Sequence, residues 1–333
     1  MKERNHAFDL LCGLCIVRMV SLHIMGFCGQ SDEQWWQHVM MWTYFFMSFF
    51  FFKAGYFNHG VDGDTRQYLA EKTKRLFVPY LTAGWIGMII YFAFMPYLIE
   101  RYNHPIETLE WSHLWENSGF YGNRPTWFLF SFFMTYVAVH FIEKVRWLHW
   151  AVVAFPIVSY SLYTMGNPLW MSMDNVFMGI FFFYLGKAWH EVMKRLPANR
   201  TMLLSVVLTV GFVAMNCMWK GDYTMSDNTF TGSFPTMMLK TVLAMCGISG
   251  LLLSLRIPRL PWICYIGEHS MVYFISHYPL IYIYKFTHLS FGRSIYGKPE
   301  EVLILIPVVF CVCSWLVPYV EAVPWLSGRY NKK

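Results

Sequence analysis

One stretch near the start of the chain, Phe8 to Cys28, constrains the fold more than any other. It is a nearly unbroken apolar run, long enough to cross a bilayer as a helix. It nevertheless carries three ionisable side chains, Asp9, Arg18 and His23. Because such groups are costly in hydrocarbon, they usually face a protein interior or a water-filled cavity. The run therefore predicts a membrane helix with a functional polar site, and we expect the other helices to surround His23.

The composition supports a membrane protein. Of the 333 residues, 56% are hydrophobic and only 14% are charged, and the mean hydropathy is +0.36. The first apolar run is too long for a signal-peptide core and lacks a small-residue cleavage site, so we expect it to remain as the first span. The cations behind the net charge of +6 are scattered in short loops, so membrane lipids are expected partners and nucleic acid is not.

Cysteine does not predict a disulfide framework or a metal centre. Seven of the eight cysteines fall within or at the edge of apolar spans, and only Cys28 lies near a loop. Cys12 and Cys15 have redox spacing, but they lack the strand-turn-helix context of such a motif, which favours simple packing. We expect no metal site.

Nine further apolar runs follow the first. The sequence therefore predicts an all-α, polytopic membrane protein with about ten transmembrane helices in a single domain, residues 1–333. Pro79 is expected at the first position of the third helix. The expected spans run from about Phe8 to Cys28, Val39 to Phe57, Pro79 to Ile99, Thr126 to Ile142, His149 to Met165, Asn175 to Val192, Thr201 to Trp219, Thr236 to Leu255, Trp262 to Phe286 and Val302 to Val323.

The loop charges predict the orientation of these spans. Ten spans place both termini on one side, and most of the 26 lysine and arginine residues fall on that side. Under the positive-inside rule, both termini are cytoplasmic and the long loop from Glu100 to Pro125 is external. We expect a multi-pass protein of the inner (cytoplasmic) membrane.

Two intramembrane histidines are the candidates for chemistry. His23 lies roughly 22 Å up the first helix, beyond the middle of a bilayer core about 30 Å thick. His277 shares a helix face with Ser270 and Tyr273 and is expected at a similar depth. Nothing in the sequence establishes that the two histidines meet. We expect a catalytic role for His23 over a hydrogen-bonded core role, and both roles stay open for His277.

Five segments, in chain order, are FDLLCGLCIVRMVSLH, FFFFKAGYF, KTKRLFVPYL, TWFLFSFF and GEHSMVYFISHYPL. Together they resemble the acyltransferase-3 family of membrane O-acyltransferases. The resemblance implies transfer of an acyl group, commonly acetyl, from cytoplasmic acyl-CoA to a hydroxyl of an outward-facing envelope or surface glycan. Acyl-CoA (acetyl-CoA) would be a co-substrate, with no permanently bound cofactor, and a glycan or glycolipid would be the acceptor.

The resemblance also suggests roles for residues. His23 matches the catalytic candidate of the family, as general base or acyl carrier, and Ser270, Tyr273 and His277 would orient it or stabilise an oxyanion. Arg18 points away from the His23 stripe, and we expect either a charge partner on another helix or a structural ion pair. The candidate cations for the CoA phosphates are Lys53, Lys72, Lys74 and Arg75. The candidate sugar-binding residues are Trp111, Trp115, Tyr121, Asn123, Arg124 and Trp127. For this group an interfacial aromatic belt is favoured over a sugar-binding surface.

One departure from the family pattern keeps alternatives open. The family has an arginine eleven positions before the histidine, and this chain has Cys12 there. An inactive homologue is therefore one alternative. Another is a transporter or flippase for a small anion or a lipid-linked saccharide, which would use the same buried charges, although we see no repeat symmetry of the kind transporters show.

Overall fold

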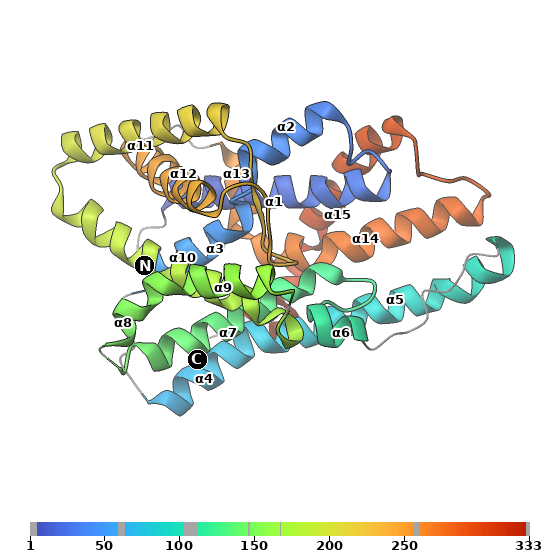
Figure 1. Ribbon diagram of the computed structural model, residues 1–333. Coiled ribbons are helices and arrows are strands. Elements are labelled where there is room, and N and C mark those ends of the chain that lie inside the picture. Colours follow the sequence, from blue (N-terminus) through green and yellow to red (C-terminus); the bar gives the residue numbers. More distant parts are fainter. Residues whose placement is uncertain are drawn as a thin grey trace.

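A computed structural model describes residues 5–58, 64–102, 112–145, 147–166, 168–255 and 260–330. Helices make up most of this part of the chain, and the long ones run roughly side by side (Figure 1). The first half holds α1 (His6–Phe27), α2 (Gln34–Thr43), α3 (Phe46–Tyr56), α4 (Thr65–Lys72), η1 (Thr73–Phe77), α5 (Val78–Tyr102), α6 (Ser112–Asn117), η2 (Arg124–Thr126), α7 (Trp127–Ile142), α8 (Leu148–Ala151), η3 (Val152–Ala154) and α9 (Phe155–Thr164). The second half holds η4 (Trp170–Ser172), α10 (Asp174–Arg195), α11 (Ala198–Met218), β1 (Tyr223–Thr224), β2 (Thr229–Phe230), α12 (Phe234–Ser254), α13 (Pro261–Glu268), α14 (Ser270–Ser290), α15 (Pro299–Glu321) and α16 (Pro324–Ser327).

Six helical segments of the described chain are long and apolar enough to cross a membrane. They are His6–Phe27, Thr65–Phe94, Arg124–Ile142, Ala198–Met218, Phe234–Ser254 and Pro299–Glu321. This confirms a mostly helical, multi-pass membrane protein. The other four predicted spans also form helices, but these are broken, shorter or more polar than a simple span.

The predicted span from Val39 to Phe57 is not one helix. It divides at Tyr44 into α2 and α3. The Thr43 hydroxyl donates to the carbonyl of Val39 at 2.6 Å and accepts from Nε of Arg18 at 3.3 Å. Because a threonine that bonds back to the preceding turn bends a helix, this pair of bonds explains the break where the sequence shows no proline or glycine.

The prediction that Pro79 begins the third span is wrong. The helix begins at Thr65, where Asp64 caps it by accepting from the backbone N–H of Arg66 at 3.3 Å. It continues through the π-helical turn η1 into α5, so Pro79 lies inside the helix. Proline cannot donate to the carbonyl four residues earlier, and the widened turn just before it accommodates that missing bond.

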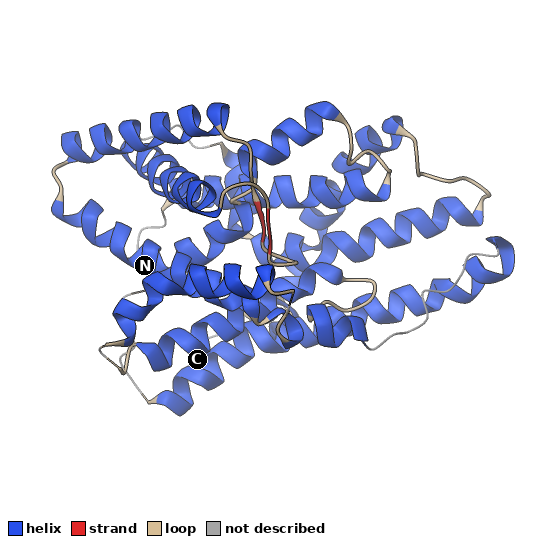
Figure 2. Cartoon of the chain, in the orientation of Figure 1, coloured by secondary structure: helices blue, strands red, loops and turns tan. Residues whose placement is uncertain are grey.

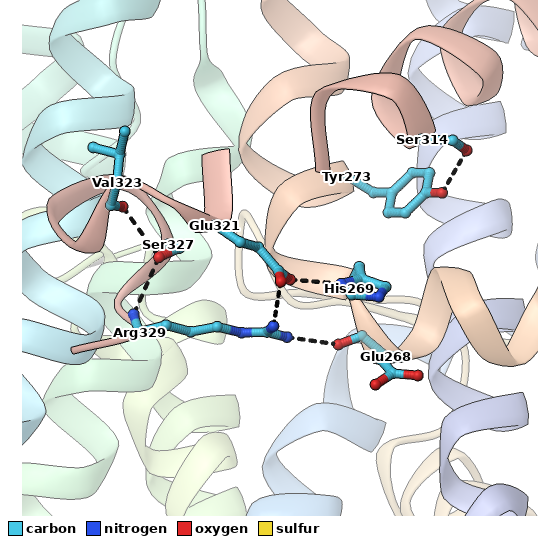
Figure 3. A network of polar contacts seen from close by, with 8 residues as sticks. All are labelled: Glu268, His269, Tyr273, Ser314, Glu321, Val323, Ser327 and Arg329. Carbon is cyan, nitrogen blue, oxygen red and sulfur yellow. Dashed lines mark hydrogen bonds and ion pairs between the residues drawn. The ribbon is translucent and has the colours of Figure 1, made fainter. Parts of the chain in front are cut away.

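The predicted ninth span is also divided, at His269, into α13 and α14. A polar network holds this break (Figure 3). Glu321, at the end of α15, contacts Nδ1 of His269 at 2.5 Å and Nη1 of Arg329 at 2.5 Å. Nη2 of Arg329 donates to the carbonyl of Glu268 at 3.1 Å. The C-terminal segment is therefore fastened to the start of α14, and both chain ends lie towards the left of Figure 1.

The polar loop between α11 and α12 contains the small antiparallel hairpin β1–β2, which an all-α prediction misses (Figure 2). Asn228 holds its turn against α9, because it accepts from the Ser159 hydroxyl at 2.7 Å and donates to the Ser159 carbonyl at 3.1 Å. Asn175 of α10 donates to the carbonyl of Met225 at 3.1 Å. Residue Lys240, predicted inside the eighth span, donates to two backbone carbonyls at the hairpin's base. The hairpin is therefore fixed over the helices.

Helix α1 has well-defined ends. Asn5 caps its start by accepting from the backbone N–H of Ala7 at 3.1 Å. At its other end Gly29 has a φ of +67°, and the next N–H donates to the carbonyl of Met25 at 2.8 Å, which is a Schellman motif. Gly267 of α13 crosses α1 so closely that a Cβ would lie 1.8 Å from the Asp9 carbonyl oxygen. These features fix the height of His23 in the bundle.

Candidate active site

The two intramembrane histidines meet. The ring of His23 on α1 stacks on the ring of His277 on α14, with 5.2 Å between centroids and 30° between planes. Tyr278 closes a second side of His23, edge-on at 5.1 Å. The sequence did not establish whether the two histidines are in contact. The packing of α1 against α14 brings them together.

His277 has a defined orientation. Its Nδ1 donates to the backbone carbonyl of Tyr273, one turn earlier, at 2.9 Å. Since a carbonyl only accepts, the proton of the neutral ring lies on Nδ1 and the lone pair on Nε2. Nε2 is buried and has no hydrogen-bond partner among the described residues. An unpaired buried acceptor beside His23 is the arrangement expected where a substrate or a transferred proton completes the site.

A proline places the loop that precedes α7 against this pair. Pro279 inside α14 leaves the carbonyl of Ile275 without its helical donor. The side-chain amide of Asn123 donates to that carbonyl at 3.0 Å and to the carbonyl of Ala83 on α5 at 3.2 Å. Asn123 is fully buried, so it acts by joining α5, η2 and α14. This bridge brings Arg124 and Trp127 to His23.

Two cavities border His23, which itself is only partly buried. The larger, of 190 Å³, has polar side chains, including Asn117, Arg124 and Asp227, within a mainly apolar wall. Its lining is His23, Asn117, Gly119, Tyr121, Arg124, Pro125, Trp127, Ser226, Asp227 and Tyr278. The smaller, of 110 Å³, is mainly apolar. Its lining is Arg18, Met19, Leu22, His23, Met40, Tyr44, Phe46, Met47, Pro125, Trp127, Phe274 and the hairpin residues 222–226. His23 therefore lies between two compartments whose walls carry different side chains.

Arg18 shares the smaller cavity with His23, although the helical periodicity places it on another face of α1. Its guanidinium donates to Thr43 and, through Nη2, to the sulfur of Met40 at 2.9 Å, and it lies 3.7 Å from the ring centroid of Phe46. The expected charge partner on another helix is not seen among these contacts. Tyr223 borders the same cavity, and burial raises the pKa of its hydroxyl well above 10.0, so this group remains a neutral donor.

The other predicted catalytic residues lie further off. The hydroxyl of Tyr273 contacts that of Ser314 on α15 at 2.7 Å (Figure 3). Its link to the histidine pair is therefore through its backbone carbonyl. Ser270 begins α14, seven residues before His277, which is roughly 10 Å along a helix axis. The structure brings together His23, His277 and Arg18, and leaves Ser270 at the helix break.

The predicted phosphate-binding cations fall into two groups. Lys53 on α3 reaches into the bundle, and its Nζ donates to the sulfur of Cys12 on α1 at 3.0 Å. Lys72 instead lies over the ring of Tyr136 at 4.2 Å. Lys74 lies 5.9 Å from the ring centroid of Tyr330 and is exposed, as is Arg75. The cation at Cys12 and the three on the α4–η1 segment thus have different surroundings.

The predicted sugar-binding residues also separate. Tyr121, Arg124 and Trp127 line the larger cavity. Trp115 stacks on Trp170 at 5.3 Å and is half-exposed, which suits an interfacial position. Asn123 has the bridging role described above. Trp111 lies outside the described residues.

Sequence reasoning missed several residues that line the larger cavity, among them Asn117, Ser226, Asp227 and Tyr278. Tyr278 follows His277 directly and could have been included with it. Ser226 and Asp227 belong to the hairpin turn, and no local signal linked that loop to a histidine two hundred residues earlier. Their place in the site follows from the tertiary contacts of the hairpin.

Comparisons with curated proteins and with solved structures find no match. A family model described as an acyltransferase domain matches residues 5–317. The matched region includes α1 with His23, α14 with His277 and the hairpin between α11 and α12. The resemblance seen in five motifs is therefore confirmed over almost the whole chain, and the chain belongs to the acyltransferase-3 family of membrane acyltransferases.

Proposed function

We propose that this membrane acyltransferase moves a short acyl group, such as acetyl, from cytoplasmic acyl-CoA to a hydroxyl of an envelope or surface glycan or glycolipid. The observation that carries the proposal is the position of His23 between two cavities, with its ring stacked on His277. A two-substrate transfer needs one proton-exchanging group that both substrates can reach. His23, which lines both cavities, is the residue to which we assign this role.

In the proposed reaction, the acceptor hydroxyl enters the larger cavity, beside its polar side chains. His23 takes its proton as the oxygen attacks the thioester carbonyl, and the C–S bond then breaks to release CoA. The imidazolium of His23 returns the proton to the departing thiolate, so charge and protons balance. His277 fixes the ring of His23 from one side, and Tyr278 fixes it from another. A covalent route through an acyl-histidine would use the same ring.

The Lys53–Cys12 contact supports the donor side of this proposal. The family pattern places an arginine at position 12, and this chain places a cysteine there. The Nζ of Lys53 lies 3.0 Å from that sulfur. A cation from α3 thus occupies the region where the family carries one on α1, which argues against an inactive homologue. Lys72, Lys74 and Arg75 would contact the CoA phosphates.

The proposed topology has ten crossings, with α2–α3, α8–α9, α10 and α13–α14 added to the six simple spans. Broken helices are tolerated at membrane depth where they border a cavity or are buried in protein. Both chain ends lie on one side of the bundle (Figure 1), which supports the expectation from the positive-inside rule that both termini face the cytoplasm from the inner membrane.

The direct test uses the purified full chain in nanodiscs with acetyl-CoA labelled in the acyl group and a polysaccharide extract from the producing cell. Label should pass to the glycan with the wild type and not with His23→Ala. The matched control is His288→Ala, since His288, like His277, lies on α14 with its Nδ1 close to a carbonyl four residues earlier, at 3.0 Å, but lines neither cavity. Full transfer by His23→Ala would refute the mechanism.

A transporter or flippase is the second candidate, and the two broken helices α2–α3 and α13–α14 favour it, because discontinuous helices form substrate sites in transporters. The same nanodisc assay separates the two. A transporter would leave the glycan unlabelled, and in proteoliposomes it would move a labelled anion or lipid-linked saccharide across the bilayer.

A further inference from the structure

We infer that the transferred acyl group carries a carboxylate at its far end, as in succinyl, and that Arg18 binds this carboxylate in the smaller cavity. The inference rests on the proposed acyl transfer and names its donor class. A dicarboxylic acyl-CoA would place its thioester at His23 and its free carboxylate at the guanidinium.

The first observation is the incomplete pairing of Arg18. The residue is 92% buried, since only 8% of its surface is exposed. Its neutral partners are Thr43, the sulfur of Met40 and the ring of Phe46. Nη1 is buried and has no hydrogen-bond partner among the described residues. A buried guanidinium with a free N–H is costly, and an anion supplied by a ligand would remove that cost.

The second observation is that Arg18 and His23 line the same cavity. Both line the 110 Å³ cavity. They are five residues apart on α1, roughly 7.5 Å along the axis. A succinyl group has three carbon–carbon bonds of ~1.5 Å each, which span about 4 Å when extended. With a hydrogen bond of about 2.9 Å at the carboxylate end, an extended succinyl group reaches about 7 Å, a length comparable with this axial separation.

The walls of this cavity favour the acyl group over the acceptor. Met19, Met40 and Met47 and the ring of Phe274 suit a short methylene chain. The larger cavity on the other side of His23 offers the amide, hydroxyl and charged groups that suit a sugar. Each substrate thus has a compartment with side chains that suit it.

Asp222 is the one carboxylate that lines the smaller cavity. Its Oδ1 accepts from the Thr231 hydroxyl at 2.5 Å, at the base of the hairpin. Its negative charge favours the charged form of Arg18 and opposes a second carboxylate nearby. Removing that charge should therefore strengthen binding of a dicarboxylic acyl group, which gives a variant with the opposite effect from loss of Arg18.

The experiment compares succinyl-CoA with butyryl-CoA, which has the same four-carbon chain without the carboxylate, and with acetyl-CoA. In nanodiscs with the glycan extract, kcat/KM of the wild type for succinyl-CoA should exceed that for butyryl-CoA by about tenfold to a hundredfold, as expected for one charged hydrogen bond. Equal values, or a preference for butyryl-CoA, would overturn the inference whether or not any variant folds. If no donor supports transfer, the proposed function itself fails.

The variants locate the preference. Arg18→Gln should bring the succinyl-to-butyryl ratio of kcat/KM close to one, Arg18→Lys should keep part of it, and Asp222→Asn should raise it. An equal loss with both donors in Arg18→Gln would assign Arg18 to the reaction centre and overturn the inference. A ratio that is unchanged, with a higher KM for an acidic glycan, would assign the arginine to the acceptor and would also overturn it.

Discussion

The histidine pair and the cations of the α4–η1 segment are two polar regions that differ in how well the protein itself satisfies them. At the pair, Nε2 of His277 is buried and lacks a partner among the described residues, and cavities lie beside His23. On the α4–η1 segment, Lys72 rests on Tyr136, and Lys74 and Arg75 reach solvent. Buried polar groups left unpaired are costly, so they persist where a substrate completes them. The comparison predicts large effects at the pair and graded ones at the cations.

The largest effect is expected for His23→Ala. Loss of a general base typically costs about 10²–10⁴-fold in rate. The rate of acyl transfer to the glycan, measured as incorporation of label, should fall by that factor. Because His23 is only partly buried and borders cavities, the variant should insert and unfold much as the wild type does. Wild-type rates of transfer by this variant would contradict the prediction that substitutions at the histidine pair have larger effects than those at the cations.

A smaller effect on activity is expected for Asn123, which holds the elements of the site in position. Asn123→Ala removes the donor that satisfies the Ile275 carbonyl beside Pro279, and an unsatisfied buried carbonyl costs about 1–3 kcal/mol. Thermal unfolding in detergent should shift down by several degrees, and activity should fall with it. The matched control is Asn216→Ala, because Asn216 is equally buried and its amide has no partner among the described residues. Equal shifts for both variants would contradict the bridging role.

The sequence predicted much of this arrangement and missed other parts for physical reasons. The apolar length of α1 and its ionisable residues predicted the central helix, and two histidines at matched depth gave the candidates. Their contact depends on how α1 packs against α14, which no local pattern specifies. The break at Tyr44 is accompanied by two bonds of Thr43, one to Val39 and one to Arg18, twenty-five residues away. The hairpin reaches the cavities through Asn228 and Ser159. The spacing of apolar residues along the sequence does not predict long-range contacts of this kind.

Lys53 shares a property with each region. It lies inside the bundle, as the histidine pair does, and it is a candidate phosphate-binding cation, as the residues of the α4–η1 segment are. Lys53→Met should raise the KM for acyl-CoA by about tenfold, the value of one charge-assisted contact, with a smaller change in kcat. The cation can also be moved to the other helix: Lys53→Met combined with Cys12→Arg places it on α1, as in the family pattern, and should restore most of the loss. A double variant no better than Lys53→Met would show that the contact at 3.0 Å serves packing alone.

The smallest effect is expected at the exposed end of the cation segment. Lys74 is exposed and lies 5.9 Å from the ring centroid of Tyr330, so Lys74→Gln should leave unfolding unchanged. If Lys74 contacts a CoA phosphate, the variant should raise the KM for acyl-CoA about two- to threefold at low salt, as expected for an exposed ion pair of about 0.2–1 kcal/mol.

Screening shortens the range of such attraction from about 10 Å at 0.1 M salt to about 3 Å at 1 M. The KM of the wild type should therefore approach that of Lys74→Gln as salt is added, whereas the deficit of Lys53→Met, inside the bundle, should persist. A deficit of Lys74→Gln that is independent of salt would place this lysine with the buried groups and remove the distinction between the two regions.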